Sequence, residues 1–144
     1  MTTDAELRSD LIGHAGRDIS HPLLLAVKSL TNWPVDEFAL DLREPDDQWV
    51  AWLQGGAVGF VSGKGPFNDP SVSGVVRPLR TVQSVVVTTR YVDDGARSQI
   101  HRAITVTFEA GADLQIDPGS FVADHFRDHA DGFVAGLLRA IAGV

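Results

Sequence analysis

The spacing of hydrophobic residues at the start of the chain predicts two short helices. Over residues 4–14, apolar side chains recur at helical intervals. A second helix is expected over residues 20–30, with Pro22 in the first turn, where proline is tolerated. Three of its residues are expected to face the core: Leu23, Val27 and Leu30. This helix should end at Trp33-Pro34, because a residue before proline is disfavoured in the α region.

From residue 35 onward the hydrophobic period changes to two, which predicts β-strands. Short segments rich in Gly, Asp and Pro separate these strands, as antiparallel hairpins require. The strands are expected at 35–43, 49–53, 57–61, 80–92, 100–108 and 114–116. Between Ser62 and Pro78 the chain is rich in Gly and Pro, which predicts a long irregular segment with at most a short edge strand at 72–76.

Large apolar residues recur three and four apart near the end of the chain, which predicts a helix over residues 119–143. Ser120 is the expected N-cap of this helix. Gly132 and Gly136 weaken the helical pattern, and a break near residues 128–131 is compatible with it.

The order of these elements predicts a single α+β domain over residues 1–144. It divides into a helical segment (1–33), an antiparallel sheet (35–116) and the C-terminal helix (119–143). Six or seven strands are expected to form a strongly bent sheet or open barrel that the last helix covers. By topology alone this arrangement resembles the pleckstrin-homology fold. No sequence motif of that family supports the resemblance, and a fold does not by itself determine a function.

Composition narrows the function classes. The chain has 144 residues, with 19 acidic against 12 basic side chains, a net charge of -7 and no cysteine. Without cysteine there is no disulfide, thiolate nucleophile or cysteine-ligated metal, and no cofactor motif is present. The acidic balance argues against nucleic-acid and membrane surfaces. The N-terminus lacks the basic start and apolar stretch of a signal peptide, so a cytoplasmic location is expected.

His125 and His129 form the one candidate metal site. At a spacing of four residues, both rings would lie on one face of a helix and could share a divalent ion. The run from His125 to His129 is similar to the inverted zinc-protease motif, with Asp128 replacing its glutamate. No third ligand is marked. The alternative is an ordinary solvated start of a helix.

Other catalytic signals are weaker. The glycine-rich stretch 55–65 lacks the spacing of a phosphate-binding loop. No serine lies in a nucleophile-elbow motif. His101 is expected on the polar face of a strand, where it would be solvated rather than act as an acid or base.

A partner or ligand surface is the remaining candidate, and five residues are assigned to it: Trp49, Trp52, Phe67, Arg77 and Arg80. Trp49 and Trp52 are three apart in a strand, so they should point to opposite faces, one buried and the other available. The two arginines could bind a carboxylate or phosphate, or could pair internally with Asp93 and Asp94 in a nearby hairpin.

Three functions follow from these patterns. A non-catalytic protein-interaction or binding module is preferred, with a protein partner or a second copy docking along an open edge strand. In a pleckstrin-homology-like arrangement, the acidic first hairpin turn, residues 43–47, would not favour an anionic lipid headgroup. The alternatives are a small metal-dependent enzyme that uses His125 and His129, and a carrier that encloses a small apolar ligand.

Overall fold

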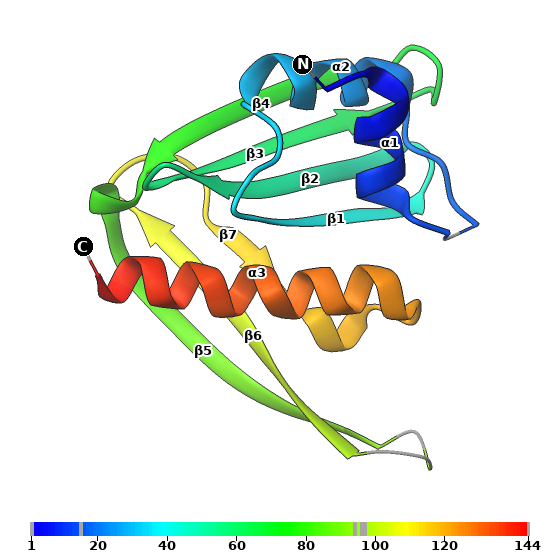
Figure 1. Ribbon diagram of the computed structural model, residues 1–144. Helices are drawn as coiled ribbons and strands as arrows, with labels where there is room; N and C mark the ends of the chain where they lie inside the picture. The colour runs from blue at the N-terminus through cyan, green and yellow to red at the C-terminus, as the bar shows by residue number, and fades with distance from the viewer. Residues whose placement is uncertain (1, 15, 94, 96–97, 144) are drawn as a thin grey trace.

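Alternating apolar and polar residues in the first half of the chain build a four-stranded antiparallel sheet. The computed structural model describes residues 2–14, 16–93, 95 and 98–143 (Figure 1). The strands follow one another in chain order: β1 (Glu37–Glu44), β2 (Asp47–Gln54), β3 (Ala57–Lys64) and β4 (Ser71–Pro78). Each neighbouring pair is antiparallel, as expected for strands joined by short turns.

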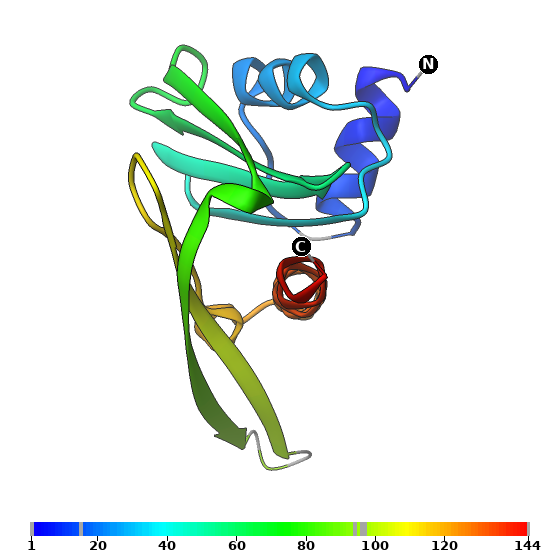
Figure 2. The ribbon, with the colours of Figure 1, turned by 90° about the vertical axis from the view of Figure 1, so that its left-hand side faces the viewer.

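A second antiparallel sheet holds the next three strands in the order β5-β6-β7: β5 (Val82–Asp93), β6 (Ser98–Phe108) and β7 (Leu114–Ile116). A single 3₁₀ turn, η1 (Leu79–Thr81), connects the two sheets. β5 and β6 form a long hairpin that is strongly twisted and projects away from the rest of the molecule (Figures 1 and 2).

The helices lie on opposite sides of the first sheet. α1 (Asp4–Ile12) and α2 (His21–Leu30) cover one face, and α3 (Asp124–Ala142) follows the 3₁₀ turn η2 (Pro118–Ser120). Figure 2 shows α3 end-on, beneath the first sheet and beside the β5–β6 hairpin. α3 therefore packs between the two sheets, mainly against β1 and also against β6.

Buried polar contacts fix how the N-terminal helices meet the sheet. The side chain of Gln48 is buried; its Oε1 accepts from the Ser20 amide at 2.9 Å, and its Nε2 donates to the Asp18 carbonyl at 2.9 Å. The hydroxyl of Ser20 donates to the Phe67 carbonyl at 2.7 Å. These bonds satisfy polar groups that would be costly to bury alone, and they join the start of α2 to β2 and to the loop after β3.

Glycines in α3 have a packing role that the sequence pattern obscures. A Cβ atom on Gly136 would lie 2.8 Å from Cγ of Glu37, and one on Gly132 would lie 3.2 Å from its Oε2. The two glycines are one turn apart and therefore share a helix face. Glycine has a low helix propensity, which weakens the helical pattern of the sequence, but at these two positions it lets α3 approach β1 closely.

The predicted fold class is confirmed as α+β with antiparallel strands. The strands form two sheets of four and three strands rather than one continuous bent sheet, and neither sheet closes. The irregular segment is shorter than predicted: β3 extends to Lys64 and β4 begins at Ser71, which leaves only residues 65–70 outside the strands. Glycine and proline in 62–78 mislead the prediction because β4 is an edge strand, where these residues are tolerated.

Two details of the predicted helices are wrong. α3 begins at Asp124 with Ala123 as its N-cap, and the hydroxyl of Ser120 instead donates to the Asp117 carbonyl at 2.7 Å. No break occurs near residues 128–131. In α2, Leu30 is 44% exposed, and Leu24 is buried in its place.

The three described helices include none that is both long and apolar enough to cross a membrane.

Candidate functional site

The outer part of the β5–β6 hairpin carries an exposed apolar surface. Tyr91 and Ile100 are cross-strand partners and are 63% and 70% exposed. Val87 lies four residues before Tyr91, on the same side of β5, and is 44% exposed. The exposed Arg102 lies opposite Thr89, between the Tyr91–Ile100 pair and the Val87–Ile104 pair. We refer to Val87, Tyr91, Ile100 and Arg102 as the hairpin surface.

The same hairpin presents an open sheet edge. β5 is the outer strand of its sheet, so half of its backbone amides and carbonyls point away from β6. Edge strands are usually protected by charged residues or proline, yet residues 82–89 contain neither. This edge and the hairpin surface together form an uncovered surface of the kind that protein partners bind.

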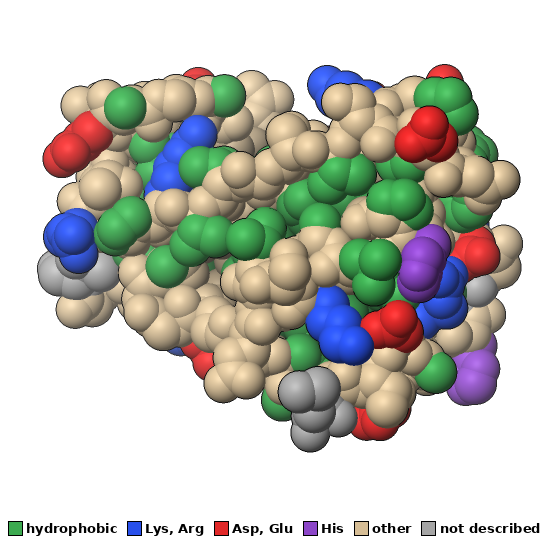
Figure 3. Space-filling model, turned by 90° about the horizontal axis from the view of Figure 1, so that it is seen from above, with side chains coloured by type: hydrophobic (Ala, Val, Ile, Leu, Met, Phe, Trp, Pro, Cys, Tyr) green, Lys and Arg blue, Asp and Glu red, His purple; other side chains and the backbone are tan. Residues whose placement is uncertain are grey.

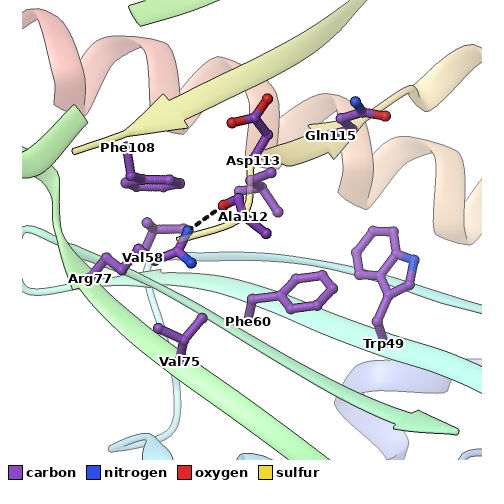
Figure 4. A pocket seen from close by; sticks show the side chains of 10 residues that line it. Trp49, Val58, Phe60, Val75, Arg77, Phe108, Ala112, Asp113 and Gln115 are labelled. Carbon is purple, nitrogen blue, oxygen red and sulfur yellow. Dashed lines mark hydrogen bonds between the residues drawn. The ribbon is translucent and has the colours of Figure 1, made fainter. Parts of the chain in front are cut away.

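A second candidate is an apolar pocket between the two sheets. Its volume is about 180 Å³. The first sheet contributes Trp49, Val58, Phe60 and Val75 to one wall, and the second contributes Phe108 and Leu114 to the other. Figure 4 shows the rings of Trp49 and Phe60 side by side along the first wall; their centroids are 5.6 Å apart. We refer to this cavity as the Trp49 pocket.

Arg77 lies at one end of the Trp49 pocket, between its two walls (Figure 4). Its Cζ is 4.4 Å from the centroid of the Phe108 ring, and its Nη1 donates to the Ala112 carbonyl at 2.7 Å. Gly111, with a φ of 91°, leaves the space that the guanidinium occupies, because a Cβ there would collide with Nη2. Arg77 thus holds the β6–β7 connection against β4.

A more polar cavity of about 350 Å³ adjoins the Trp49 pocket and shares Trp49 and Gln115 with it. The charged side chains that line this cavity form ion pairs within the chain. Arg43 donates to Asp41 at 2.7 Å, a hydrogen bond that raises the pKa of Arg43. Arg90 of β5 donates to Asp117 at 2.8 Å. Because its charges are matched within the chain, this cavity offers a ligand no unsatisfied net charge.

The structure separates the five residues predicted for a partner or ligand surface. Trp49 and Arg77 meet at the Trp49 pocket. Trp52 is buried at 2% exposure on the opposite face of the first sheet, as the spacing of the tryptophans predicts. Phe67 lines a shallow hollow near Asp18, and Arg80 is exposed and lines none of these cavities.

The expected ion pairs of the two arginines are not observed among the described residues. Asp93 is described and pairs with neither Arg77 nor Arg80, whereas Asp94 lies outside the described residues. Arg80 lies in η1, before the start of β5, whereas Asp93 is the last residue of β5, so the length of the strand separates them.

His125 and His129 do lie together on α3, with ring centroids 4.7 Å apart. Each ring has another role. Nε2 of His125 donates to the Leu11 carbonyl at 2.9 Å, and His129 stacks on Phe38 at 4.1 Å. Burial, together with the neighbouring His125, lowers the pKa of His129. Within the part of the chain that is described, no three side chains form a metal-binding cluster, so the metal site stays a prediction without geometric support.

The expectation that His101 is solvated is wrong. Its side chain is only 2% exposed, and Nδ1 lies 2.8 Å from Oδ1 of Asp131 on α3. Nε2 is buried and has no partner among the described residues. The alternation of residues in β6 does not predict that His101 is buried, because its burial depends on α3 packing against the twisted hairpin. His101 lines none of the four cavities described for the molecule.

A further apolar area lies over α2 and β4. Figure 3 views the molecule from above, where hydrophobic side chains form a band across the middle of the surface. The exposed members on these two elements include Leu25, Leu30 and Val76, with exposed fractions from 42% to 47%. These fractions are lower than those of Tyr91 and Ile100, so the hairpin surface is the stronger candidate for docking.

Comparison of the chain with protein families, with curated proteins and with solved structures found no match.

Proposed function

We propose that this chain is a non-catalytic protein-interaction module, and that the hairpin surface is its docking site. The observation that carries the proposal is the exposed Tyr91–Ile100 pair on a hairpin that projects from the body of the molecule. Tyrosine and arginine are among the residue types most enriched where interfaces gain their binding energy. An aromatic–aliphatic pair beside Arg102 therefore supports protein docking better than simple solvation.

The partner is a protein, either a second copy of this chain or another chain. The unprotected edge of β5 supports pairing with a strand of the partner, because backbone hydrogen bonds and alternating side chains then contribute together. The net charge of -7 opposes a second copy and favours a partner of lower or opposite charge.

The proposal includes a pleckstrin-homology-like arrangement. A four-stranded antiparallel sheet, a three-stranded one and a helix that follows the last strand support it. The turn between β1 and β2 exposes Glu44, Asp46 and Asp47, so an anionic lipid headgroup is not the expected ligand. We further propose a cytoplasmic location, because a chain without cysteine is compatible with a reducing compartment.

The test compares the wild type with the double variant Tyr91→Ser/Ile100→Ser in the cells that normally make the protein. Co-purification and light scattering report partners and self-association, and thermal unfolding checks the fold. Val122→Ser is the matched control, because Val122 is 89% exposed but lies outside the hairpin.

We expect the wild type and Val122→Ser to retain the same partner or dimer. The double variant should lose it, while its unfolding temperature remains close to that of the wild type. A monomeric wild type without a partner would contradict the proposal, and so would a double variant that keeps its partner.

A further inference from the structure

We propose that the Trp49 pocket binds a small apolar monocarboxylate, with Arg77 as the residue that recognises its carboxylate. This site lies between the two sheets and does not involve the hairpin surface. The inference is therefore independent of the proposed docking function, and either can fail without the other.

The walls of the pocket define the apolar part of the ligand. Aromatic and aliphatic side chains make up most of the lining: Trp49, Val58, Phe60, Val75, Phe108 and Leu114. The volume of about 180 Å³ is comparable to the roughly 150 Å³ of an apolar cavity that holds benzene. An aromatic ring or a short alkyl chain is therefore the group that fits.

The polar end of the ligand follows from the state of Arg77. Its guanidinium makes one hydrogen bond, to the Ala112 carbonyl, and stacks on Phe108. No carboxylate of the described residues lies within ion-pair distance of it. A guanidinium has five N–H donors in a planar fork, so several remain for a carboxylate.

The surrounding charges leave this role to Arg77. Asp113 also lines the pocket, but it is exposed and its carboxylate points away from the guanidinium (Figure 4). In the adjoining cavity, Asp41 pairs with Arg43 and Asp117 pairs with Arg90. Arg77 is thus the cation at the pocket that the described acidic residues leave without a counter-ion, and an anionic ligand would supply one.

Calorimetric titration of the purified protein tests the inference. The probes are phenylacetate and octanoate, each compared with its neutral amide, phenylacetamide or octanamide. The two acids distinguish an aromatic from an alkyl ligand, and the amides isolate the contribution of the carboxylate. We expect saturable binding of at least one acid, at least about tenfold tighter than that of its amide, because a hydrogen bond to a charged group is stronger than one to a neutral group.

Three variants assign the binding to this pocket. Arg77→Gln should remove the preference for acid over amide while it preserves amide binding. Val75→Phe should abolish binding of both, because its larger ring fills the space beside Phe60. Arg80→Gln is the matched control: the exposed Arg80 lies three residues from Arg77 but does not line the pocket, and its loss should change nothing.

Three results in the binding data would overturn the inference. One is that neither acid binds the wild type saturably, and another is that each acid binds no more tightly than its amide. The third is that Arg77→Gln keeps the preference for the acid. Thermal unfolding of each variant shows whether it is folded, and a folded Val75→Phe that still binds both probes would also exclude this pocket.

Discussion

Trp52 lies across Gly59 where β2 pairs with β3, and this contact illustrates how a single residue controls the packing beneath α2. The indole ring occupies the space that a Cβ on Gly59 would need. Trp52 is itself almost fully buried, so it has no room to move aside.

We therefore expect Gly59→Ala to lower the free energy of unfolding by about 1–3 kcal/mol, the usual cost of overpacking a core. Chemical denaturation measures the change. Gly16→Ala is the control, because beyond its two chain neighbours no described residue has an atom within 4 Å of the Cβ it would add. Equal stability of Gly59→Ala and the wild type would show that the indole does not lie on this glycine.

His129 gives the molecule a pH-dependent contribution to stability. Burial lowers its pKa below the ordinary value of 6.5, and the neighbouring His125 acts in the same direction. The unfolded chain consequently binds more protons than the folded one between the two pKa values of His129, so stability rises with pH in that window. This contribution is complete above 6.5 and is lost as the pH falls through the lowered pKa.

Thermal unfolding between neutral and mildly acidic pH tests this assignment. We expect the unfolding temperature of the wild type to fall as the pH drops below 6.5, and that of His129→Gln to fall less over the same range. Parallel pH profiles for the two proteins would contradict the assignment.

At the scale of elements, α3 joins parts of the chain that are far apart in sequence. Its Asp131 meets His101 of β6, and its His125 bonds the end of α1. The amphipathic pattern of residues 119–143 predicts a helix that covers the sheet. A pattern within one helix does not identify the residues that the helix contacts in other elements. His101 is polar and lies beside exposed residues in β6, so its burial becomes visible only when α3 is in place.

The Asp131–His101 contact supports a prediction for α3. Asp131→Ala would leave both nitrogens of a buried imidazole without partners among the described residues. We expect a loss of about 1–3 kcal/mol in the free energy of unfolding, the cost of a buried unsatisfied polar group. Asp128→Ala, an exposed carboxylate on the same helix, should have little effect. If both variants unfold alike in denaturant, the contact does not stabilise the docking of α3.

At the scale of the whole molecule, the sequence predicted the helices, most strands and the α+β class, because each depends on local periodicity. It did not predict the division into two sheets, because that division occurs at the short turn after Pro78, where the hydrophobic pattern continues into β5. Trp49 and Arg77 were identified as candidates from their residue types. Their meeting with Phe108 across the two sheets depends on tertiary packing, which no spacing rule encodes.

The hairpin surface was the main functional feature that the sequence did not reveal. Tyr91 and Ile100 lie in strands whose alternation indicates one buried and one solvated face. They are exposed because they lie on the face of the hairpin opposite His101, whose side chain packs against α3, and the hairpin projects from the rest of the molecule (Figures 1 and 2). The unusually long strand predicted at 80–92 was the available signal, since a strand of that length can extend past a small core.

Site-specific photo-crosslinking at Tyr91 tests the proposed docking function most directly. A photoreactive amino acid would replace Tyr91 in one variant and Val122 in another, both in the protein's native cells, and mass spectrometry would map each adduct. The account predicts a discrete protein adduct at Tyr91, to a second copy or another chain, that is absent at Val122 and lost when Ile100→Ser is added. No adduct at Tyr91, or the same adducts at both positions, would contradict it.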